Sequence, residues 1–317
     1  MLKVGFIGAG PRAQSAHYPN VKRLNDVQMA AVCELDEGRL DQVVEKYGIP
    51  QVYTNHQEML AHADLDIVYC IMNERWLLQP ALDALNAGKH IFIEKPPGAN
   101  MTEVQQLLDA AVANNVYAMV GFQRRYAAVT REAMRRVAAK GPVSTVVGTF
   151  NKQLMGEDAG GFTTTLWNDV SHVVDLVRYM AGGEATAVTA YQDSFSGPYR
   201  DCYTALIRFD NNATGVIFGN RVSGGRVLRA ELHGVGVGCY IDLPQALEIH
   251  QDNQMERLGG WEIDNVAQAD TPRYEGVLAM HEHFIDCVLN GQTPLTDLRD
   301  VIHSMRLVAQ IEGTEPV

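Results

Sequence analysis

The sequence has little positive charge, few cysteines and no long apolar run. Its 26 Lys and Arg against 38 Asp and Glu give a net charge of −12, which argues against general nucleic-acid binding. No run approaches the roughly 18 apolar residues of a membrane span, and glycines interrupt the apolar start, which favours a buried strand over a signal peptide. The five cysteines are scattered without a C-x-x-C, typical of a reduced cytoplasmic protein without disulfides or a zinc site. The 317 residues predict two domains.

The first 121 residues alternate between apolar runs and stretches with helical spacing. The runs are KVGFIGA, QMAAVCE, IVYCIM, HIFIEK and YAMVGF. Residues 38–48 have the apolar spacing of a helix that ends at Gly48, a typical C-terminal cap. Another helix is predicted from residue 101, with Thr102 as its N-cap. Strands that alternate with helices predict right-handed βαβ units, and therefore an α/β domain with a doubly wound parallel sheet.

A glycine-rich turn follows the first apolar run, in VGFIGAGPRA. Gly8 and Gly10 match the first two positions of the G-x-G-x-x-G/A motif, and Ala13 fills the third. In this motif the first glycine makes a tight turn, the second lets the backbone approach a pyrophosphate, and a small third residue lets helix and strand pack closely. Glu34 ends the second run, where an acid would meet the ribose hydroxyls. The turn therefore predicts dinucleotide binding, with a purely structural corner as the alternative.

Glu34 also bears on the choice of dinucleotide. Its charge would repel the 2′-phosphate of NADP, Asp36 stands close by, and no Arg or Lys immediately follows Glu34. These residues favour NAD. Arg12, in the loop itself, could still hold a phosphate, so NADP remains the alternative cofactor.

The second half of the chain predicts a different kind of sheet. VSTVVGTF, ATAVTAYQD, YTALIRFD, ATGVIFGN, RAELHGV and GCYIDL are short, rich in Val, Ile, Tyr and Thr, and separated by turns. GVGVG lies between the last two and lacks a following helix, so we interpret it as a bend between strands. Few helices separate these strands, which predicts an antiparallel sheet with one solvated face.

Several stretches in a shared order resemble the Gfo/Idh/MocA oxidoreductases, the glucose–fructose oxidoreductase and inositol dehydrogenase family. They are Glu94-Lys95-Pro96 in HIFIEKPPGA, then MVGFQRRYAAVTREAMRRVAAKGPVSTV, SHVVDLVRYMAGG and HEHFIDCVLNGQTPLTDLRDVIHSMRLVAQI. The resemblance covers nearly the whole chain. It implies a Rossmann NAD(P)-binding domain over residues 1–121. It also implies an α+β domain over residues 122–317, with an open, mostly antiparallel sheet that binds substrate and forms a dimer or tetramer, and with C-terminal helices near the first domain.

The resemblance further implies hydride transfer between NAD(P) and a sugar, a polyol or a related small hydroxy or carbonyl compound. Such a reaction needs a base to take the hydroxyl proton, and a positioned histidine or lysine suits this role. His172 is the first candidate for this base. The alternative is a histidine that packs in the core or caps its helix. Lys95 follows a buried strand and, by resemblance, would bridge nicotinamide and substrate, with Glu94 orienting it. The predicted cofactor contacts are Gly8, Gly10, Pro11, Arg12, Ala13, Glu34, Met72, Asn73, Glu94 and Lys95.

The chain departs from the family pattern at two positions. Several family dehydrogenases carry an aspartate four residues before the histidine, where this chain has Asn168, and Asp169 stands next to it. An asparagine can bind a hydroxyl but cannot serve as a carboxylate base. Either Asp169 takes the part, with helix capping as the alternative, or Asn168 only orients the substrate, or the activity is altered. Trp76 stands where the family often has a histidine. Its side chain either lines the substrate pocket or only packs against neighbouring residues.

Two weaker signals complete the predicted site. Arg124 or Arg125 could grip an anion or hydroxyls of the substrate, with ordinary salt bridging as the alternative. His281 and His283 form an H-x-H, but side chains two apart on a helix diverge, so no metal site is predicted. The predicted catalytic residues are Lys95, His172 and Asp169, and the predicted substrate contacts are Lys95, Arg124, Asn168, Asp169 and His172.

Two other functions stay open at this point. A regulator or sensor can use the same fold without catalysis, since fold alone does not fix function. An NAD-using glycosidase would oxidise its substrate only transiently. The leading hypothesis is an NAD-dependent dehydrogenase or reductase.

Overall fold

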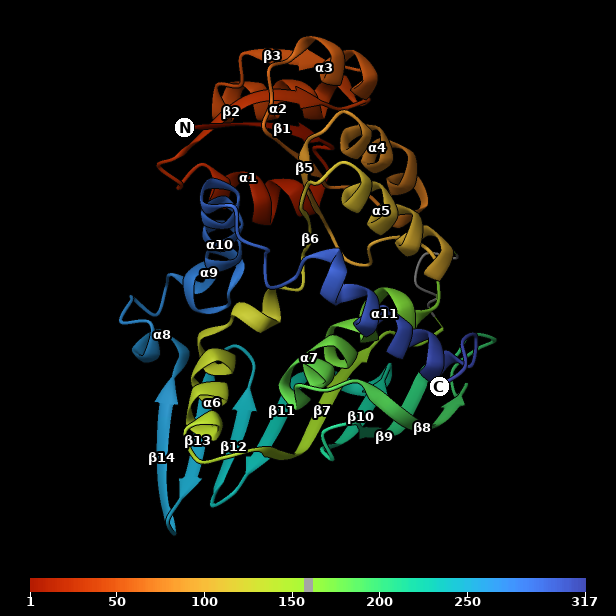
Figure 1. Cartoon of the computed structure of the whole chain (residues 1–317), viewed down its shortest axis with the longest axis vertical. Coiled ribbons are helices and arrows are strands. Elements are labelled where there is room, and N and C mark those ends of the chain that lie inside the picture. The colour runs from red at the N-terminus through yellow and green to blue at the C-terminus, as the bar shows by residue number, and fades with distance from the viewer. Residues whose placement is uncertain (157–161) are drawn as a thin grey trace. The chain divides into compact units, whose positions relative to one another are not determined.

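The computed structural model describes residues 1–156 and 162–317 of the chain. These residues form two compact units (Figure 1). The first unit combines Met1–Phe122 with Val277–Ile302, and the second combines Gln123–Gly276 with His303–Val317. No helix within the described ranges is long and apolar enough to cross a membrane.

The first unit is built on a six-stranded parallel sheet, which confirms the predicted doubly wound α/β fold. The strand order is β3-β2-β1-β4-β5-β6, so the chain builds one half outward from β1 and the other half outward from β4. This reversal is the topological switch point, beside which ligands bind at the carboxyl ends of the strands. The strands are β1 (Leu2–Ile7), β2 (Val27–Cys33), β3 (Gln51–Tyr53), β4 (Ile67–Cys70), β5 (His90–Ile93) and β6 (Ala118–Val120).

Helix ends in the first unit follow the local cap residues. Gly48 ends its helix in the left-handed region, at φ 67°, as predicted. The prediction of Thr102 as an N-cap is wrong. Asn100 has an extended backbone and its side chain accepts from Glu103 N at 3.1 Å, whereas Thr102 already lies in the first turn. The helices are η1 (Ala13–His17, a π-helix), α1 (Tyr18–Val21), α2 (Glu37–Tyr47), α3 (His56–His62), α4 (Glu74–Asn86) and α5 (Met101–Ala113).

Residues from near the C-terminus complete the first unit. α10 (Val277–Asn290) and the start of α11 (Leu298–Glu312) belong to it. Along the last strand, β6, Val120 N donates to Thr296 O at 2.8 Å. The fully buried Asp297 accepts from Ala118 N at 3.0 Å. The edge of the sheet is therefore satisfied by residues that come late in the chain.

The second unit contains an eight-stranded sheet in the order β14-β13-β12-β11-β7-β10-β9-β8. β7 and β10 pair parallel and the other neighbouring strands pair antiparallel, which confirms a mostly antiparallel sheet. The predicted bend lies between β11 and β12. The strands are β7 (Val143–Gln153), β8 (Ala185–Asp193), β9 (Cys202–Phe209), β10 (Thr214–Asn220), β11 (Val222–Gly234), β12 (Val237–Asp242), β13 (Ala246–Gln251) and β14 (Gln254–Gly259).

Helices cover one face of this sheet (Figure 1). α7 packs on β7 and β10, and α6 packs on β11, β12 and β13. On β9 buried and exposed residues alternate, because successive side chains point to opposite faces. The opposite face exposes large apolar side chains, among them Leu206, Phe218 and Tyr240. The helical segments are η2 (Gln123–Tyr126, a 3₁₀-helix), α6 (Ala128–Ala138), η3 (Leu166–Val170, a π-helix), α7 (Ser171–Ala181), α8 (Gly260–Ile263) and α9 (Thr271–Tyr274).

Candidate functional site

The glycine-rich loop after β1 has the geometry that its sequence requires. Gly8 has φ +104°, and a Cβ there would lie 2.2 Å from the backbone oxygen of Ile71, so only glycine fits. A Cβ on Gly10 would meet no atom within 4 Å, which leaves room for a ligand against the backbone. Ala13, the first residue of η1, is fully buried, so a larger side chain there would have to displace its close-packed neighbours. These three positions fit the pyrophosphate-binding motif.

Glu34 lies beside this loop. Its Oε2 accepts from Ala9 N at 2.7 Å, and its Oε1 accepts from Leu35 N at 2.8 Å and from Asp36 N at 3.1 Å. The carboxylate is thus held at the carboxyl end of β2, next to the glycine turn. This placement fits an acid that receives ribose hydroxyls. Asp36, in contrast, caps α2 by accepting from Arg39 N.

The residues after β4 close the other side of the switch point. Met72 is partly buried, and Asn73 caps α4 by accepting from Arg75 N at 3.0 Å. Trp76 does not pack in the core, because 66% of its surface is exposed and the Arg75 guanidinium lies 5.2 Å from its ring centroid. Pro11 is exposed at the tip of the glycine loop.

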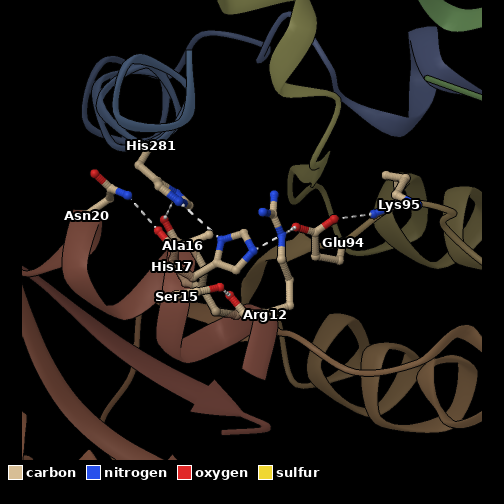
Figure 2. A network of polar contacts seen from close by, with 9 residues as sticks. Arg12, Ser15, Ala16, His17, Asn20, Glu94, Lys95 and His281 are labelled. Atoms are coloured by element: carbon tan, nitrogen blue, oxygen red, sulfur yellow. Dashed lines mark hydrogen bonds and ion pairs between the residues drawn. The ribbon is translucent and has the colours of Figure 1, made fainter. Parts of the chain in front are cut away.

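Glu94 is bound by two side chains and one backbone amide within the first unit (Figure 2). It is 7% exposed, and its Oε2 accepts from Lys95 N at 3.0 Å. Its Oε1 accepts from Arg12 Nε at 2.7 Å and is 2.8 Å from His17 Nε2. Burial by itself would raise the pKa of Glu94, but the His17 hydrogen bond and the Arg12 charge outweigh it and hold the pKa well below its usual range. Glu94 therefore ties the glycine loop to the main chain of Lys95.

In the second unit, His172 lies in the first turn of α7, directly after the π-helix η3. Its ring is partly buried, with its centroid 6.3 Å from that of Phe150 on β7. Asn168 and Asp169 lie in η3 and are also partly buried. The prediction that the histidine begins a helix is confirmed.

Asp169 is an ion-pair partner and makes no capping bond to α7. Its carboxylate lies 2.7 Å from Lys152 Nζ and 3.0 Å from Arg221 Nη2. Arg221 is 1% exposed and also donates from Nη1 to Phe150 O at 3.1 Å. Burial lowers the pKa of Arg221, and the charge of Asp169 opposes that shift. Neither cation could be predicted from the sequence around Asp169, because both come from other segments of the chain.

The two candidate arginines are buried and ion-paired. Arg124 Nη1 lies 3.0 Å from Glu275 Oε1. Arg125 Nε donates to Asp175 Oδ2 at 3.0 Å, and both partners are 1% exposed. These contacts are those of the salt-bridging alternative, and substrate binding by Arg124 remains a prediction.

The H-x-H pair diverges as predicted. His281 is fully buried and contacts His17 and Tyr69, whereas His283 accepts from Leu295 N at 2.9 Å. Among residues 1–156 and 162–317, no group of His, Cys, Asp and Glu could hold a metal ion. His17 was not among the predicted site residues, although a histidine between apolar residues of the first helix is a signal for a buried polar contact.

Both units match models of known protein families. Residues 2–122 match the family model described as an oxidoreductase family with an NAD-binding Rossmann fold, and residues 133–236 match the GFO/IDH/MocA C-terminal domain. The scyllo-inositol 2-dehydrogenase (NAD(+)) of Bacillus subtilis is 26% identical over 285 residues, which cover 84% of this chain and 80% of that protein. A putative oxidoreductase of Salmonella typhimurium, YceM, is 26% identical over 316 residues, or 97% and 96% of the two chains.

Solved structures share the fold over nearly the full length. A dehydrogenase from Chromobacterium violaceum has a TM-score of 0.91 at 18% identity, covering 99% of this chain and 95% of that one. A levoglucosan dehydrogenase in complex with NADH and levoglucosan has a TM-score of 0.87 at 17% identity, covering 99% and 96%. At these identities the likeness concerns the fold.

Proposed function

The chain belongs to the Gfo/Idh/MocA family of oxidoreductases and carries its NAD-binding Rossmann fold; from this premise we propose that it transfers a hydride between NAD and a CH–OH carbon of a sugar, a polyol or a related compound. One observation carries the proposal. The bond from Arg12 Nε to Glu94 Oε1, at 2.7 Å, ties the glycine-rich loop to the residue that precedes Lys95. The cofactor cradle and the candidate catalytic lysine are thereby joined within one unit. The inositol and levoglucosan dehydrogenases among its relatives and neighbours support this substrate class.

The residues of the first unit fit NAD. Gly8, Gly10 and Ala13 would hold the pyrophosphate, and Glu34 would receive the adenosine ribose hydroxyls. The bound dinucleotide supplies the hydride acceptor. A 2′-phosphate would approach the Glu34 carboxylate, which three backbone amides hold in place, so we propose a preference for NAD over NADP. Pro11, Arg12, Met72 and Asn73 would line the same cradle.

Lys95 and His172 divide the catalytic work in this proposal. The Lys95 ammonium would hold the substrate hydroxyl and polarise its O–H bond. The His172 imidazole would accept the hydroxyl proton as the C–H bond breaks. Asn168 would hold a neighbouring hydroxyl through its amide.

Asp169 has a positioning role in the proposal. The Asp169 carboxylate is already held in two ion pairs, at 2.7 Å from Lys152 Nζ and 3.0 Å from Arg221 Nη2. Asp169 therefore anchors η3, from which Asn168 projects, through Lys152 and Arg221. Arg124 would support the substrate side through its pair with Glu275.

The open face of the eight-stranded sheet is the proposed contact between copies of the chain. Leu206, Phe218 and Tyr240 are 55%, 42% and 43% exposed on that face. Contiguous exposed apolar groups mark protein interfaces. A dimer or tetramer through this face would cover them, and Leu206→Glu should shift the sedimentation coefficient toward that of the monomer. The five free cysteines support a reducing, cytoplasmic location.

A cofactor-reduction assay over a panel of polyols and sugars tests the function. A dehydrogenase produces NADH steadily, an NAD-using glycosidase cleaves its substrate without net NADH, and a sensor binds NAD without turnover. Lys95→Ala should lower kcat by roughly 100-fold or more, the scale of a lost acid–base group, with little change in melting temperature. Lys22→Ala, at an exposed lysine of the same unit, is the matched control. Turnover of Lys95→Ala near that of the wild type would remove Lys95 from the mechanism.

A further inference from the structure

A continuous chain of buried polar side chains runs through the first unit and ends at Glu94 (Figure 2). Tyr69 Oη lies 3.2 Å from His281 Nδ1. His281 Nε2 lies 3.2 Å from His17 Nδ1, and His17 Nε2 lies 2.8 Å from Glu94 Oε1. The four groups come from β4, α10, η1 and the end of β5, so tertiary folding alone brings them together.

The four hydrogen-bonded side chains are buried away from solvent. Tyr69, His281 and His17 are 0% exposed, and Glu94 is 7% exposed. Aromatic rings surround the histidines, with the Phe92 ring centroid 5.3 Å from that of His17 and 5.1 Å from that of His281. In such surroundings an unpaired polar group is costly, so the hydrogen bonds must be satisfied within the chain itself.

The neighbours of Glu94 fix the direction of its hydrogen bonds. Arg12 Nε and Lys95 N can only donate, so both carboxylate oxygens act as acceptors. The His17 hydrogen bond and the Arg12 charge hold the pKa of Glu94 well below its usual range, so the carboxylate is ionised. His17 must therefore donate from Nε2. Burial lowers the pKa of His17, so its ring is neutral and its Nδ1 carries no hydrogen.

The same reasoning assigns the donors and acceptors of the other hydrogen bonds between these side chains. Because His17 Nδ1 is an acceptor, His281 must donate from Nε2. Burial also lowers the pKa of His281 well below its ordinary value, so its Nδ1 is a bare acceptor that receives the Tyr69 hydroxyl. All the donors then point one way, from Tyr69 toward Glu94, and both histidines are neutral Nε2–H tautomers.

We propose that His17 is a positioning residue for Lys95, which it orients by fixing the Glu94 carboxylate that accepts from the Lys95 amide. His281 and Tyr69 hold His17 in the one tautomer that can do so. Arg12 also binds Glu94, but its side chain is 47% exposed and water competes for it, whereas the His17 ring is fully buried. This inference rests on the proposed catalytic role of Lys95.

The tautomers can be tested on the wild-type protein without any assay of activity. Nitrogen-15 spectra of histidine-labelled protein distinguish a protonated ring nitrogen from a bare one, and His17→Gln and His281→Gln assign the two signals. At pH 7 both rings should show a protonated Nε2 and a bare Nδ1. An Nδ1–H tautomer or an imidazolium at either position would overturn the proposed chain.

Kinetics test the positioning role. His17→Phe should lower kcat by about tenfold to 100-fold, the effect of misplacing a catalytic group by a fraction of an ångström to about 1 Å, and leave the KM for NAD within about threefold. His17→Gln, whose amide can donate to Glu94 and accept from His281, should recover most of kcat. His62→Phe, at an exposed histidine of the same unit, is the control and should match the wild type.

A double-mutant cycle separates this role from general stability. Because His17 acts through Lys95, adding His17→Phe to Lys95→Ala should cause less than about a twofold further loss. Losses that multiply would show that His17 acts independently and would overturn the inference. If Lys95→Ala itself keeps wild-type turnover, the proposed catalytic role of Lys95 fails instead, and the NMR result still decides whether the hydrogen-bond chain exists.

Discussion

Replacing Asp169 by asparagine separates a structural anchor from a catalytic base. The change removes the charge that lies 2.7 Å from Lys152 Nζ and 3.0 Å from Arg221 Nη2. Breaking a fully buried ion pair costs about 3–5 kcal/mol. Lys152 and Asp169 keep 26% and 16% of their side chains exposed, so water reduces that cost. We therefore expect a loss of about 2 kcal/mol, in the range of a hydrogen bond to a charged group.

That loss corresponds to a melting temperature about 4–8 °C lower for a domain of this size. If the carboxylate is an anchor, kcat should fall by less than about tenfold and the pH profile should keep its shape. Asp252→Asn is the control, because Asp252 is 71% exposed and pairs with Lys140 at 3.4 Å on the surface of the same unit, and its melting curve should match the wild type. A kcat that falls by roughly 100-fold or more at an unchanged melting temperature would refute the anchor role and make Asp169 the base.

Three further predictions concern the cofactor, the base and the buried histidines. Glu34→Ser should narrow the preference for NAD over NADP by relieving repulsion, and calorimetry that finds wild-type NADP binding as tight as NAD would contradict this. His172→Ala should lower kcat by roughly 10²- to 10⁴-fold and remove the limb of activity that rises with pH through about 6 to 8; an unchanged profile would mean that the proton leaves by another route. Burial lowers the pKa of His17 and His281, so below pH 6.5 the unfolded chain binds protons that the folded chain does not. In urea titrations the free energy of unfolding should therefore fall as the pH drops from 6.5 to 5, by up to about 1.4 kcal/mol per pH unit for each histidine, and a flat profile would contradict it.

The sequence predicts those strands whose apolar runs are long enough to be distinctive. β1, β2, β4 and β5 are buried on both faces and stand out for that reason. β3 was missed, because Gln51–Tyr53 is three residues long with no fully buried position. β13 and β14 were missed as well. They lie at the edge of the second sheet, and β14 exposes four of its six residues, so its sequence has no apolar run.

The candidate site also contains residues that the sequence indicates and partners that only the fold brings to them. The positions of the Gly8 turn and of Glu34 follow from a local strand-to-loop pattern, and the Glu94–Lys95 pair was singled out by the resemblance to the family motif; their functional roles stay predictions. The partners of these residues could not be predicted. His17 and His281 are 264 residues apart in sequence, and no periodicity links them. Asp169 likewise pairs with cations on other segments, whereas its local spacing suggested a catalytic carboxylate, with a helix cap as the alternative.

The late residues of the first unit have a consequence for protein synthesis. Its sheet is formed by residues up to Val120, but Asp297, Thr296 and the ring of His281 belong to the same unit. A ribosome adding about 5–20 residues per second needs roughly 10 to 40 s to pass from residue 122 to residue 302. During that interval the nascent Rossmann unit has an uncovered strand edge, and His281 is missing from the hydrogen-bonded chain between Tyr69 and His17. A ribosome-bound chain stalled at residue 122 should therefore be digested by protease faster than one stalled well beyond residue 302.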